Sequence, residues 1–349
     1  MPEVVVLDVG HGNAAIVQDG DWVVVIDCAP GDTLLRALAE RRISDIDYML
    51  ISHADSDHVG GALDILASPK IRVRRLFLNG DWFKSTKTWK LLRQAVQDAR
   101  TRSQIEVHTE LSSALGATIV HGEIVIEVLA PSPELLLGSA DRKDLKGRRL
   151  SSNSLSAVIR VLNTGEPIAI FTGDLDRTGF ENLAESGKPI RASTLVFPHH
   201  GGHPGAGGDV STFAENLCDL VHPDLVVFSI AREGHSNPRP EILSAVRKRV
   251  GGGRVACTQL SRHCSPQPPP GDDHGHLSDV ASAGAHRRLC CAGTLAITAS
   301  AGEQVIAPTR AAHLAFIERR VPTPMCISNE ERQAPPMESE IVGSGSTQS

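Results

Sequence analysis

The sequence predicts an α/β protein in which two β-sheets are covered on their outer faces by helices. Short runs rich in Val, Ile and Leu alternate with segments of helical spacing, and many of these runs end in a polar residue directly before a helix or loop. With 41% hydrophobic residues among 349, the chain can bury a core, and because only 3% are aromatic, aliphatic side chains must fill it. In layered α/β folds, ligands gather where strands end.

The first half of the chain alternates strands and helices. Strands are expected over 3–9, 22–27, 46–52 and 71–78 and, in two pieces, over 117–129; helices are expected over 32–42, 59–68 and 86–101. The strand at 46–52 ends directly at His53.

The second half contains a polar loop, a hairpin and further strands. A charged loop is expected over 132–152, and a hairpin joins 154–162 to 166–172 across Asn163-Thr164-Gly165. The remaining expected elements are helices at 177–186 and 239–250 and strands at 193–198, 224–230 and 292–299.

We expect one domain over residues 1–318. It contains an insertion loop at 259–289, which is rich in Ser, Pro, Gly, His and Asp and lacks periodicity. Residues 319–349 are polar and are expected to form a disordered tail.

Composition restricts the class of partner. No window approaches the ~18 consecutive apolar residues of a membrane span, and the N-terminus lacks a signal-peptide pattern, so we expect a cytoplasmic protein without a membrane partner. The net charge of −6 gives no global basic footprint, but residues 69–102 carry ten Lys or Arg against two Asp, and 141–149 carry five against two. These stretches are either solvated helix and loop faces or local contacts for phosphate.

The most informative segment is His53-Ala54-Asp55-Ser56-Asp57-His58-Val59-Gly60-Gly61. Four metal-competent side chains fall within six residues, immediately after an apolar strand. A tight strand-to-helix turn can direct them into one concavity, and imidazole with carboxylate suits Zn²⁺, Mn²⁺ or Fe²⁺. The segment therefore predicts a metal site.

The pattern His-x-Asp-x-Asp-His resembles the His-x-His-x-Asp-His signature of the metallo-β-lactamase fold hydrolases, and in particular the variant in the hydrolase domain of ComEC-type DNA-uptake proteins. Further segments match that subgroup in order over roughly residues 3–258: Leu7-Asp8-Val9-Gly10-His11-Gly12-Asn13-Ala14, Val25-Ile26-Asp27-Cys28, Asn153-Ser154-Leu155-Ser156, Phe171-Thr172-Gly173-Asp174, Phe197-Pro198-His199-His200-Gly201-Gly202 and Gly234-His235-Ser236-Asn237-Pro238. The resemblance implies a four-layer αββα sandwich of two mixed sheets.

The resemblance also implies a site for two divalent ions, Zn²⁺ or Mn²⁺. His53 and Asp55 would hold the first ion, Asp57, His58 and His200 the second, and Asp174 would bridge both. The third His that many relatives supply to the first ion has no match here: His108 and His121 lie outside any matching motif, and Asn153 is the nearest equivalent. We therefore expect the first ion to be held weakly.

Other candidate residues surround this site. His235, in a Gly/Ser/Asn/Pro loop, is the candidate proton donor to the leaving group, since the pKa of a His lies near neutrality. His199 is expected beside His200, and His11 (where the subgroup usually has Gln) and Asp8 either line the cleft or satisfy backbone groups in a turn.

A second cluster combines Cys and His around the insertion. Four of the seven cysteines, Cys257, Cys264, Cys290 and Cys291, lie within residues 257–291, together with His263, His274 and His276. They form either a separate structural zinc site or a set of buried free thiols, because the spacing is irregular and contains no Cys-x-x-Cys.

Two ions sharing a water would generate a hydroxide that attacks phosphorus or a carbonyl carbon. The expected function is a metal-dependent phosphodiesterase or nuclease acting on DNA, with Asp57 and His235 as catalytic residues and with protein partners in a competence or defence system. The alternatives are hydrolysis of a small ester, lactone, amide or cyclic nucleotide, and a non-catalytic module in such a system. The sequence leaves the oligomeric state open.

Overall fold

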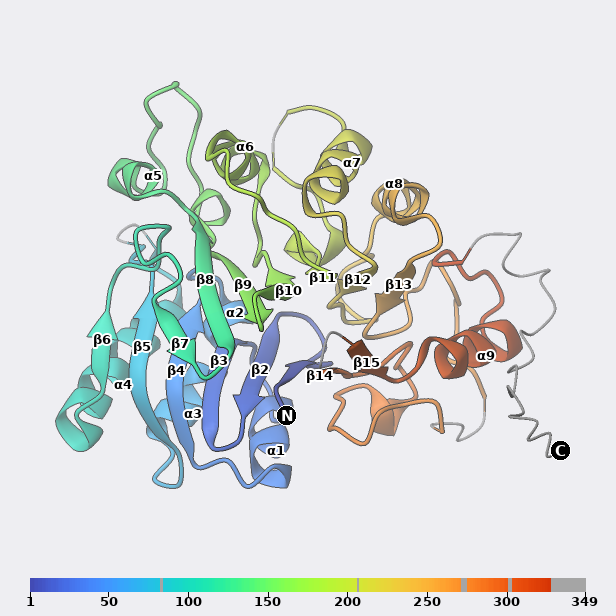
Figure 1. Cartoon of the computed structure of the whole chain (residues 1–349), viewed down its shortest axis with the longest axis horizontal. Helices are drawn as coiled ribbons and strands as arrows, with labels where there is room; N and C mark the ends of the chain where they lie inside the picture. The colour runs from blue at the N-terminus through green and yellow to red at the C-terminus, as the bar shows by residue number, and fades with distance from the viewer. Residues whose placement is uncertain (82–83, 206, 271–274, 301–302, 328–349) are drawn as a thin grey trace, which may run out of the picture.

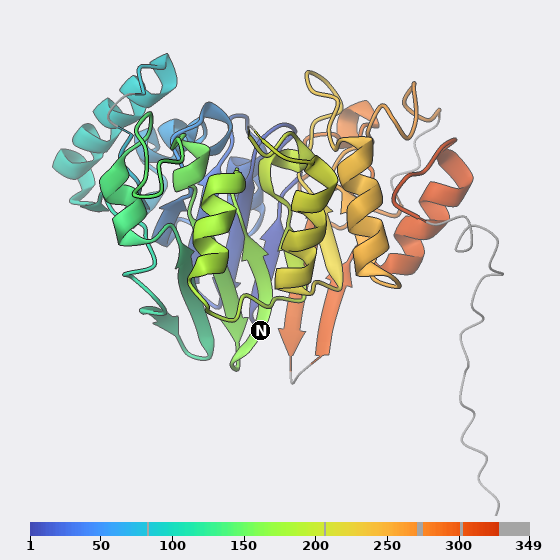
Figure 2. The same cartoon turned by 90° about the horizontal axis from the view of Figure 1, so that it is seen from above.

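The computed structural model describes residues 1–81, 84–205, 207–270, 275–300 and 303–327. Two mixed β-sheets face each other, and helices cover the outer side of each (Figures 1 and 2). The predicted four-layer αββα sandwich is confirmed.

The first sheet has the strand order β15-β14-β1-β2-β3-β4-β5-β6. Its strands are β1 (Glu3–Val6), β2 (Ala14–Asp19), β3 (Trp22–Cys28), β4 (Asp45–Ile51), β5 (Arg72–Leu78), β6 (Glu106–His108), β14 (Leu295–Ser300) and β15 (Glu303–Ala307). Pairing is antiparallel from β15 to β3 and parallel from β3 to β6.

The second sheet has the order β13-β12-β11-β10-β9-β8-β7. Its strands are β7 (Ile119–His121), β8 (Ile124–Ala130), β9 (Val158–Asn163), β10 (Glu166–Phe171), β11 (Thr194–Val196), β12 (Leu225–Phe228) and β13 (Arg254–Cys257). The strands from β10 to β13 are parallel and the others antiparallel, so the predicted hairpin of β9 and β10 is confirmed.

Among the described residues, helices pack on the outer face of each sheet, as shared buried clusters show. The first sheet is covered by α1 (Thr33–Glu40), α3 (Ala62–Ala67) and α4 (Lys87–Ser103), and the second by α6 (Arg177–Glu185), α7 (Val210–Val221), α8 (Pro240–Val250) and α9 (Arg310–Arg320). The short helices are α2 (Ser56–Val59), α5 (Pro133–Gly138), η1 (Asn153–Leu155), η2 (Pro198–Gly201) and η3 (Ala285–Arg287).

The strand β3 explains why its sequence is a continuous apolar run. Val23 and Val25 face the helices α1, α3 and α4, while Val24 and Ile26 face the second sheet. Since successive side chains of a strand point to opposite faces, a strand between two cores must be apolar at every position. Asp27 directly follows these apolar residues, one position before β3 ends at Cys28.

Several elements were absent from the sequence prediction. These are β2, β6, α5, α7, β15 and α9. The helix α7 directly follows the Pro- and Gly-rich residues 204–208, whose turn signals are local, whereas the helix is stabilised by burial of Phe213 and Leu217 against the second sheet.

The ordered fold extends past the boundary predicted at residue 319. The helix α9 continues to Arg320, and Val321, Cys326 and Ile327 are buried in the same core as α7 and α8. The predicted tail therefore begins too early, because apolar side chains beyond 319 find a core that the local composition does not reveal. The rest of that tail, 328–349, lies outside the described residues.

The insertion at 259–289 has little regular structure, as expected. Apart from η3 and a bridge between Gln259 and Cys290, its described residues form turns and loops. No helix in the described ranges has the length and apolar character needed to cross a bilayer.

Candidate metal centre

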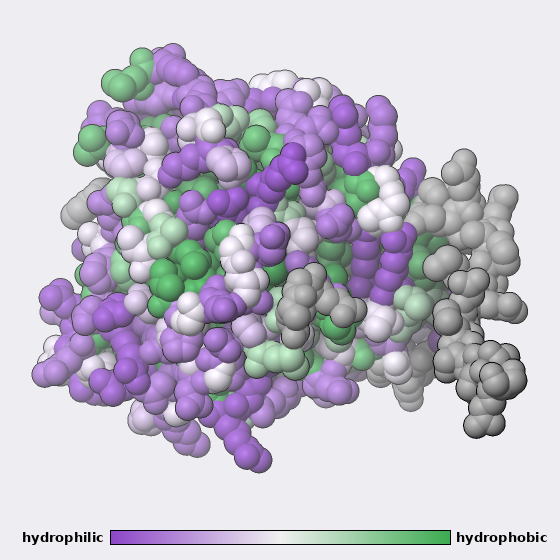
Figure 3. Space-filling model, in the orientation of Figure 1, coloured by the Kyte–Doolittle hydropathy of each residue, from purple (hydrophilic) through white to green (hydrophobic). Residues whose placement is uncertain are grey.

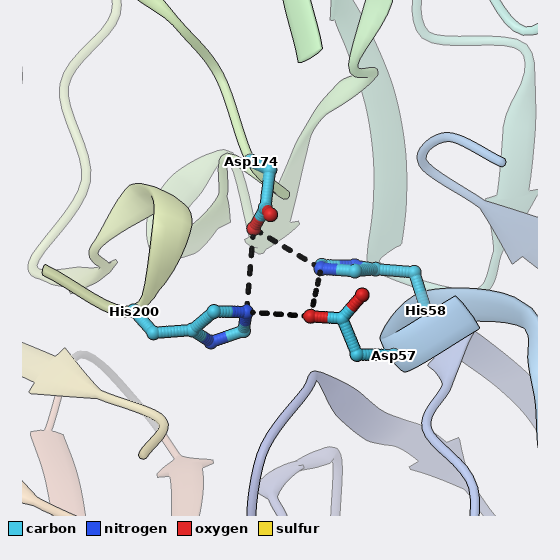
Figure 4. A group of neighbouring side chains, drawn as sticks. All are labelled: Asp57, His58, Asp174 and His200. Carbon is cyan, nitrogen blue, oxygen red and sulfur yellow. Dashed lines mark hydrogen bonds and ion pairs between the residues drawn. The ribbon is translucent and has the colours of Figure 1, made fainter. Parts of the chain in front are cut away.

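Four side chains that the sequence separates by up to 143 positions converge on one point. Ligand atoms of Asp57, His58, Asp174 and His200 all lie within 4.8 Å of one another, and Figure 4 shows the four side chains pointing toward a common centre. His200 Nε2 lies 3.2 Å from Asp57 Oδ2 and 3.4 Å from Asp174 Oδ1. His58 Nε2 lies 3.1 Å from Asp174 Oδ1.

The convergence follows from strand ends. Asp57 and His58 lie on α2, which begins five residues after the last residue of β4; Asp174 follows β10, and His200 lies in η2 after β11. At Gly173 the chain turns with φ of +51°, and a Cβ there would lie 2.3 Å from Ser156 Oγ. Glycine is therefore needed to bring Asp174 into the site.

The two histidines are held by partners on their Nδ1 side. His58 Nδ1 donates to Asp27 Oδ2 at 2.7 Å, and His200 Nδ1 donates to the Ser229 carbonyl oxygen at 2.8 Å. This arrangement directs each Nε2 into the centre, as a carboxylate–histidine–metal arrangement requires. Asp27 was not among the predicted site residues; an acidic residue ending an otherwise apolar strand is the signal that could have indicated it.

Burial and charge shift the pKa values of the group in opposite directions. Burial alone would raise the pKa of Asp174, but the neighbouring His58 and His200 lower it well below its usual value. Burial alone would lower the pKa of His58, but Asp174 and Asp27 raise it well above its usual value. Asp174 and His58 therefore favour each other's charged forms.

The predicted ligands of the first ion occupy a different environment. His53 is buried, and its Nε2 has no hydrogen-bond partner in the described chain; it lies 3.8 Å from Asp174 Oδ2 and 4.0 Å from Asp55 Oδ1. Asp55 forms an ion pair with Lys84, which the sequence analysis did not identify as a site residue. A buried polar atom without a partner is rare, so His53 Nε2 is a free ligand atom, but the carboxylate of Asp55 beside it is already paired with a cationic side chain.

Other predicted residues lie around the centre at different depths. His11 Nε2 is 3.3 Å from Asp57 Oδ2, and its ring stacks on that of His235 with centroids 4.2 Å apart. Burial, aided by the charge of His200, lowers the pKa of His11 to about 4. Asn153 Nδ2 lies 3.3 Å from His199 Nδ1, so these two contact each other at the rim.

The predicted candidate Asp8 lies elsewhere, and so do His108 and His121, which match no motif. Asp8 is fully buried, and its carboxylate accepts hydrogen bonds from the backbone of Gly10 and Gly284, from Gln259 Nε2 and from the Cys290 thiol. It therefore anchors the insertion instead of lining the cleft. His108 stacks on Phe77 and His121 on Trp22, so neither replaces the missing ligand.

The predicted zinc cluster is divided in the structure. Cys290 bonds to Asp8, whereas Cys257, Cys264 and Cys291 are buried in the core of the second sheet together with Cys326. Burial raises the pKa of the Cys257 thiol well above its usual value. Within the described residues, the metal-competent group found is the one at Asp57, and it includes no cysteine. This arrangement favours the free-thiol alternative.

Comparisons with known proteins agree with the fold. Residues 7–133 match the model of the Metallo-beta-lactamase superfamily. The chain is 22% identical over 217 residues to ComE operon protein 3 of Bacillus subtilis (strain 168) and 24% identical over 265 residues to Competence protein ComA of Neisseria gonorrhoeae. These matches cover 62% and 74% of this chain but only 24% and 31% of the two relatives, so the chain corresponds to a part of each.

Among solved structures, the metallo-beta-lactamase fold protein YhfI of Bacillus subtilis has a TM-score of 0.47 at 11% identity, covering 75% of this chain and 98% of that one. The Zn²⁺-bound PqqB of Methylobacterium extorquens has a TM-score of 0.46 at 13% identity, covering 73% and 97%. The αββα architecture described above is that of the metallo-β-lactamase fold, and residues 7–133 are similar to the Metallo-beta-lactamase superfamily.

Proposed function

We propose that this protein is a metal-dependent phosphodiesterase that cleaves DNA. The observation that carries the proposal is the convergence of Asp57, His58, Asp174 and His200, whose ligand atoms lie within 4.8 Å of one another. A divalent cation bound by such a group supplies Lewis acidity for the attack of water on phosphorus. Zn²⁺ and Mn²⁺ are the proposed ions, since two imidazoles and two carboxylates suit both.

The chain's own residues have separate tasks in this proposal. Asp27 and the Ser229 carbonyl fix the orientation of His58 and His200. His235 is exposed and stacks on His11, which itself lies against Asp57. We assign to His235 the donation of a proton to the leaving alkoxide, because it is exposed to solvent and its ring stacks on His11, which contacts Asp57.

The distribution of cations favours a polyanionic substrate. In the loop 141–149, Lys146, Arg148 and Arg149 form ion pairs with acidic neighbours. On α4, by contrast, no described partner neutralises the exposed cations Lys87, Lys90, Arg93 and Arg100.

The helix α4 lies beside the metal centre. It contacts α2, which carries Asp57 and His58. A groove of about 760 Å³ extends along α4 from Asp81 past Trp89 and Arg93 to Arg100. Hydrophilic residues dominate the lower left of the face in Figure 3, where α4 and β6 lie in Figure 1. Phosphate contacts of this kind give sequence-independent, salt-dependent binding.

The printed names of the curated relatives point in the same direction. One is named Competence protein ComA and the other ComE operon protein 3, and these names agree with the resemblance on which we base a DNA substrate. The protein partners that we expect from the sequence rest on the same resemblance, whereas the cytoplasmic location that we expect rests on the composition of the chain.

One assay tests the proposal. Purified protein is incubated with Mn²⁺ or Zn²⁺ and with linear, circular or single-stranded DNA, and products are resolved on a denaturing gel. We expect cleavage of at least one DNA form by the wild type, and none by the Asp57→Ala/Asp174→Ala variant.

A generic phosphodiester and a carboxylic ester are assayed in parallel. Intact DNA with every metal, together with cleavage of either small substrate, would replace the nuclease proposal by small-molecule hydrolysis.

A further inference from the structure

Lys84 lies at the part of the metal centre that His53 and Asp55 form. Its ammonium group pairs with Asp55 Oδ1, and only 16% of its side chain is exposed. Asp55 is one of the two ligands expected for a first ion, and the other, His53, places its unpartnered Nε2 4.0 Å from the same carboxylate oxygen. A cationic side chain thus lies where a cation was expected.

The backbone around Lys84 is fixed by Asp81. The Lys84 amide donates to Asp81 Oδ1 at 3.0 Å, and Trp89 Nε1 donates to the Asp81 carbonyl oxygen at 3.1 Å. Ser152 Oγ, from the loop beside Asn153, donates to Asp81 Oδ2 at 3.1 Å. Asp81 therefore connects the Lys84 backbone to α4 and to the loop that precedes Asn153.

The two halves of the centre differ in what they offer a metal ion. The half at Asp57, His58, Asp174 and His200 presents four converging ligand atoms. The other half has His53 Nε2 and the second oxygen of Asp174, 3.8 Å apart, but Asp55 is engaged by Lys84. A divalent ion close to an ammonium group would be repelled by it, since like charges in a partly buried site are weakly screened.

We propose that Lys84 supplies the positive charge of the first position, so that the protein holds one divalent ion at the four-residue cluster instead of two. The inference extends the proposed function: in a phosphodiesterase, the ammonium group would contact a non-bridging phosphate oxygen opposite the metal ion. His53 Nε2, which has no hydrogen-bond partner, belongs to a second metal site. This site becomes able to bind an ion when the charge of Lys84 is removed.

Metal stoichiometry tests this directly and needs no substrate. The wild type and the Lys84→Met variant are loaded with excess Mn²⁺, desalted, and measured by inductively coupled plasma mass spectrometry against protein concentration. We expect about one ion per chain for the wild type and about two for Lys84→Met, because Asp55, His53 and Asp174 then become available together.

Three control variants make the result specific. Lys87→Met removes an exposed cation three residues away and should keep one ion. Asp55→Asn combined with Lys84→Met should return the ratio to about one. Asp174→Asn should lower the ratio in either background.

Electron paramagnetic resonance of the Mn²⁺-loaded wild type gives a second readout that does not depend on any variant folding. An isolated ion gives a six-line spectrum, whereas two neighbouring ions give an exchange-coupled one. Two ions per wild-type chain, or a coupled spectrum, overturns the proposal, as does a folded Lys84→Met variant with one ion.

Failure of the proposed function would look different. A protein that binds one Mn²⁺ but cleaves no DNA keeps the Lys84 inference and loses the nuclease. If the wild type cleaves DNA and holds two ions per chain, the nuclease proposal is kept and the Lys84 inference is lost.

Discussion

Two regions of this molecule collect metal-competent side chains, and only one of them brings ligand atoms together. At the carboxyl ends of β4, β10 and β11, side chains from distant segments converge on one point. Around the insertion, Cys257 of β13 and Cys291, which precedes β14, are buried in the same core. The metal-competent group found in the described chain includes neither of them. This difference shows that a local abundance of Cys and His does not by itself form a metal site.

The physical reason lies in where the side chains stand relative to the strands. Residues after the ends of parallel strands emerge at a common edge, where loops can direct them inward. Cys290 and Cys291 are adjacent in the chain but have different partners, Asp8 for Cys290 and His313 Nε2, at 3.3 Å, for Cys291. Burial raises the pKa of Cys291 well above its usual value, and a neutral thiol is a poor metal ligand.

The largest effect expected from this comparison is at Asp174. Asp174→Asn removes charge from the residue that contacts both His58 and His200, and we expect the rate of DNA cleavage to fall by ~10³-fold or more. Gel-based initial rates measure it. Asp209→Asn, at the exposed N-cap of α7, is the matched control and should keep its activity.

His235 should have the next largest effect. If it donates the proton to the leaving group, His235→Ala lowers kcat by ~10²-fold while the bound metal per chain stays constant. Steady-state kinetics with metal analysis measures both. A loss of metal in this variant would instead make His235 a ligand, and an unchanged kcat would remove it from the mechanism.

A substitution at Asp27 tests how strongly the orientation of the His58 ring contributes to metal affinity. Asp27→Asn weakens the hold on His58 Nδ1, and we expect the affinity for Mn²⁺ or Zn²⁺ to fall about 10–100-fold. Competition with a chelating dye gives the dissociation constant. Equal affinities of variant and wild type would show that packing alone orients His58.

The smallest effect expected concerns the thiol cluster. Cys257→Ser places a hydroxyl in an apolar core, and we expect a loss of about 1–3 kcal/mol in the free energy of unfolding with no change in metal content. Denaturant titration and metal analysis measure the two quantities. A loss of one zinc ion per chain would show that this region is a metal site after all.

The local sequence determined a large part of the architecture and one half of the candidate centre. Apolar runs such as Trp22–Asp27 identify strands buried on both faces, and the cluster from His53 to His58 is visible because its members are neighbours in the chain. The positions of Asp174 and His200 came from the resemblance to a family, not from periodicity.

Tertiary structure alone decided which partner each side chain meets. Asp27 reaches His58 across 31 positions because β3 and β4 pair in parallel, and Lys84 pairs with Asp55 across 29 positions. Asp8 accepts a hydrogen bond from Gln259, which lies 251 positions later in the chain. Such pairings depend on strand order and on side-chain direction, and a local pattern of residues encodes neither.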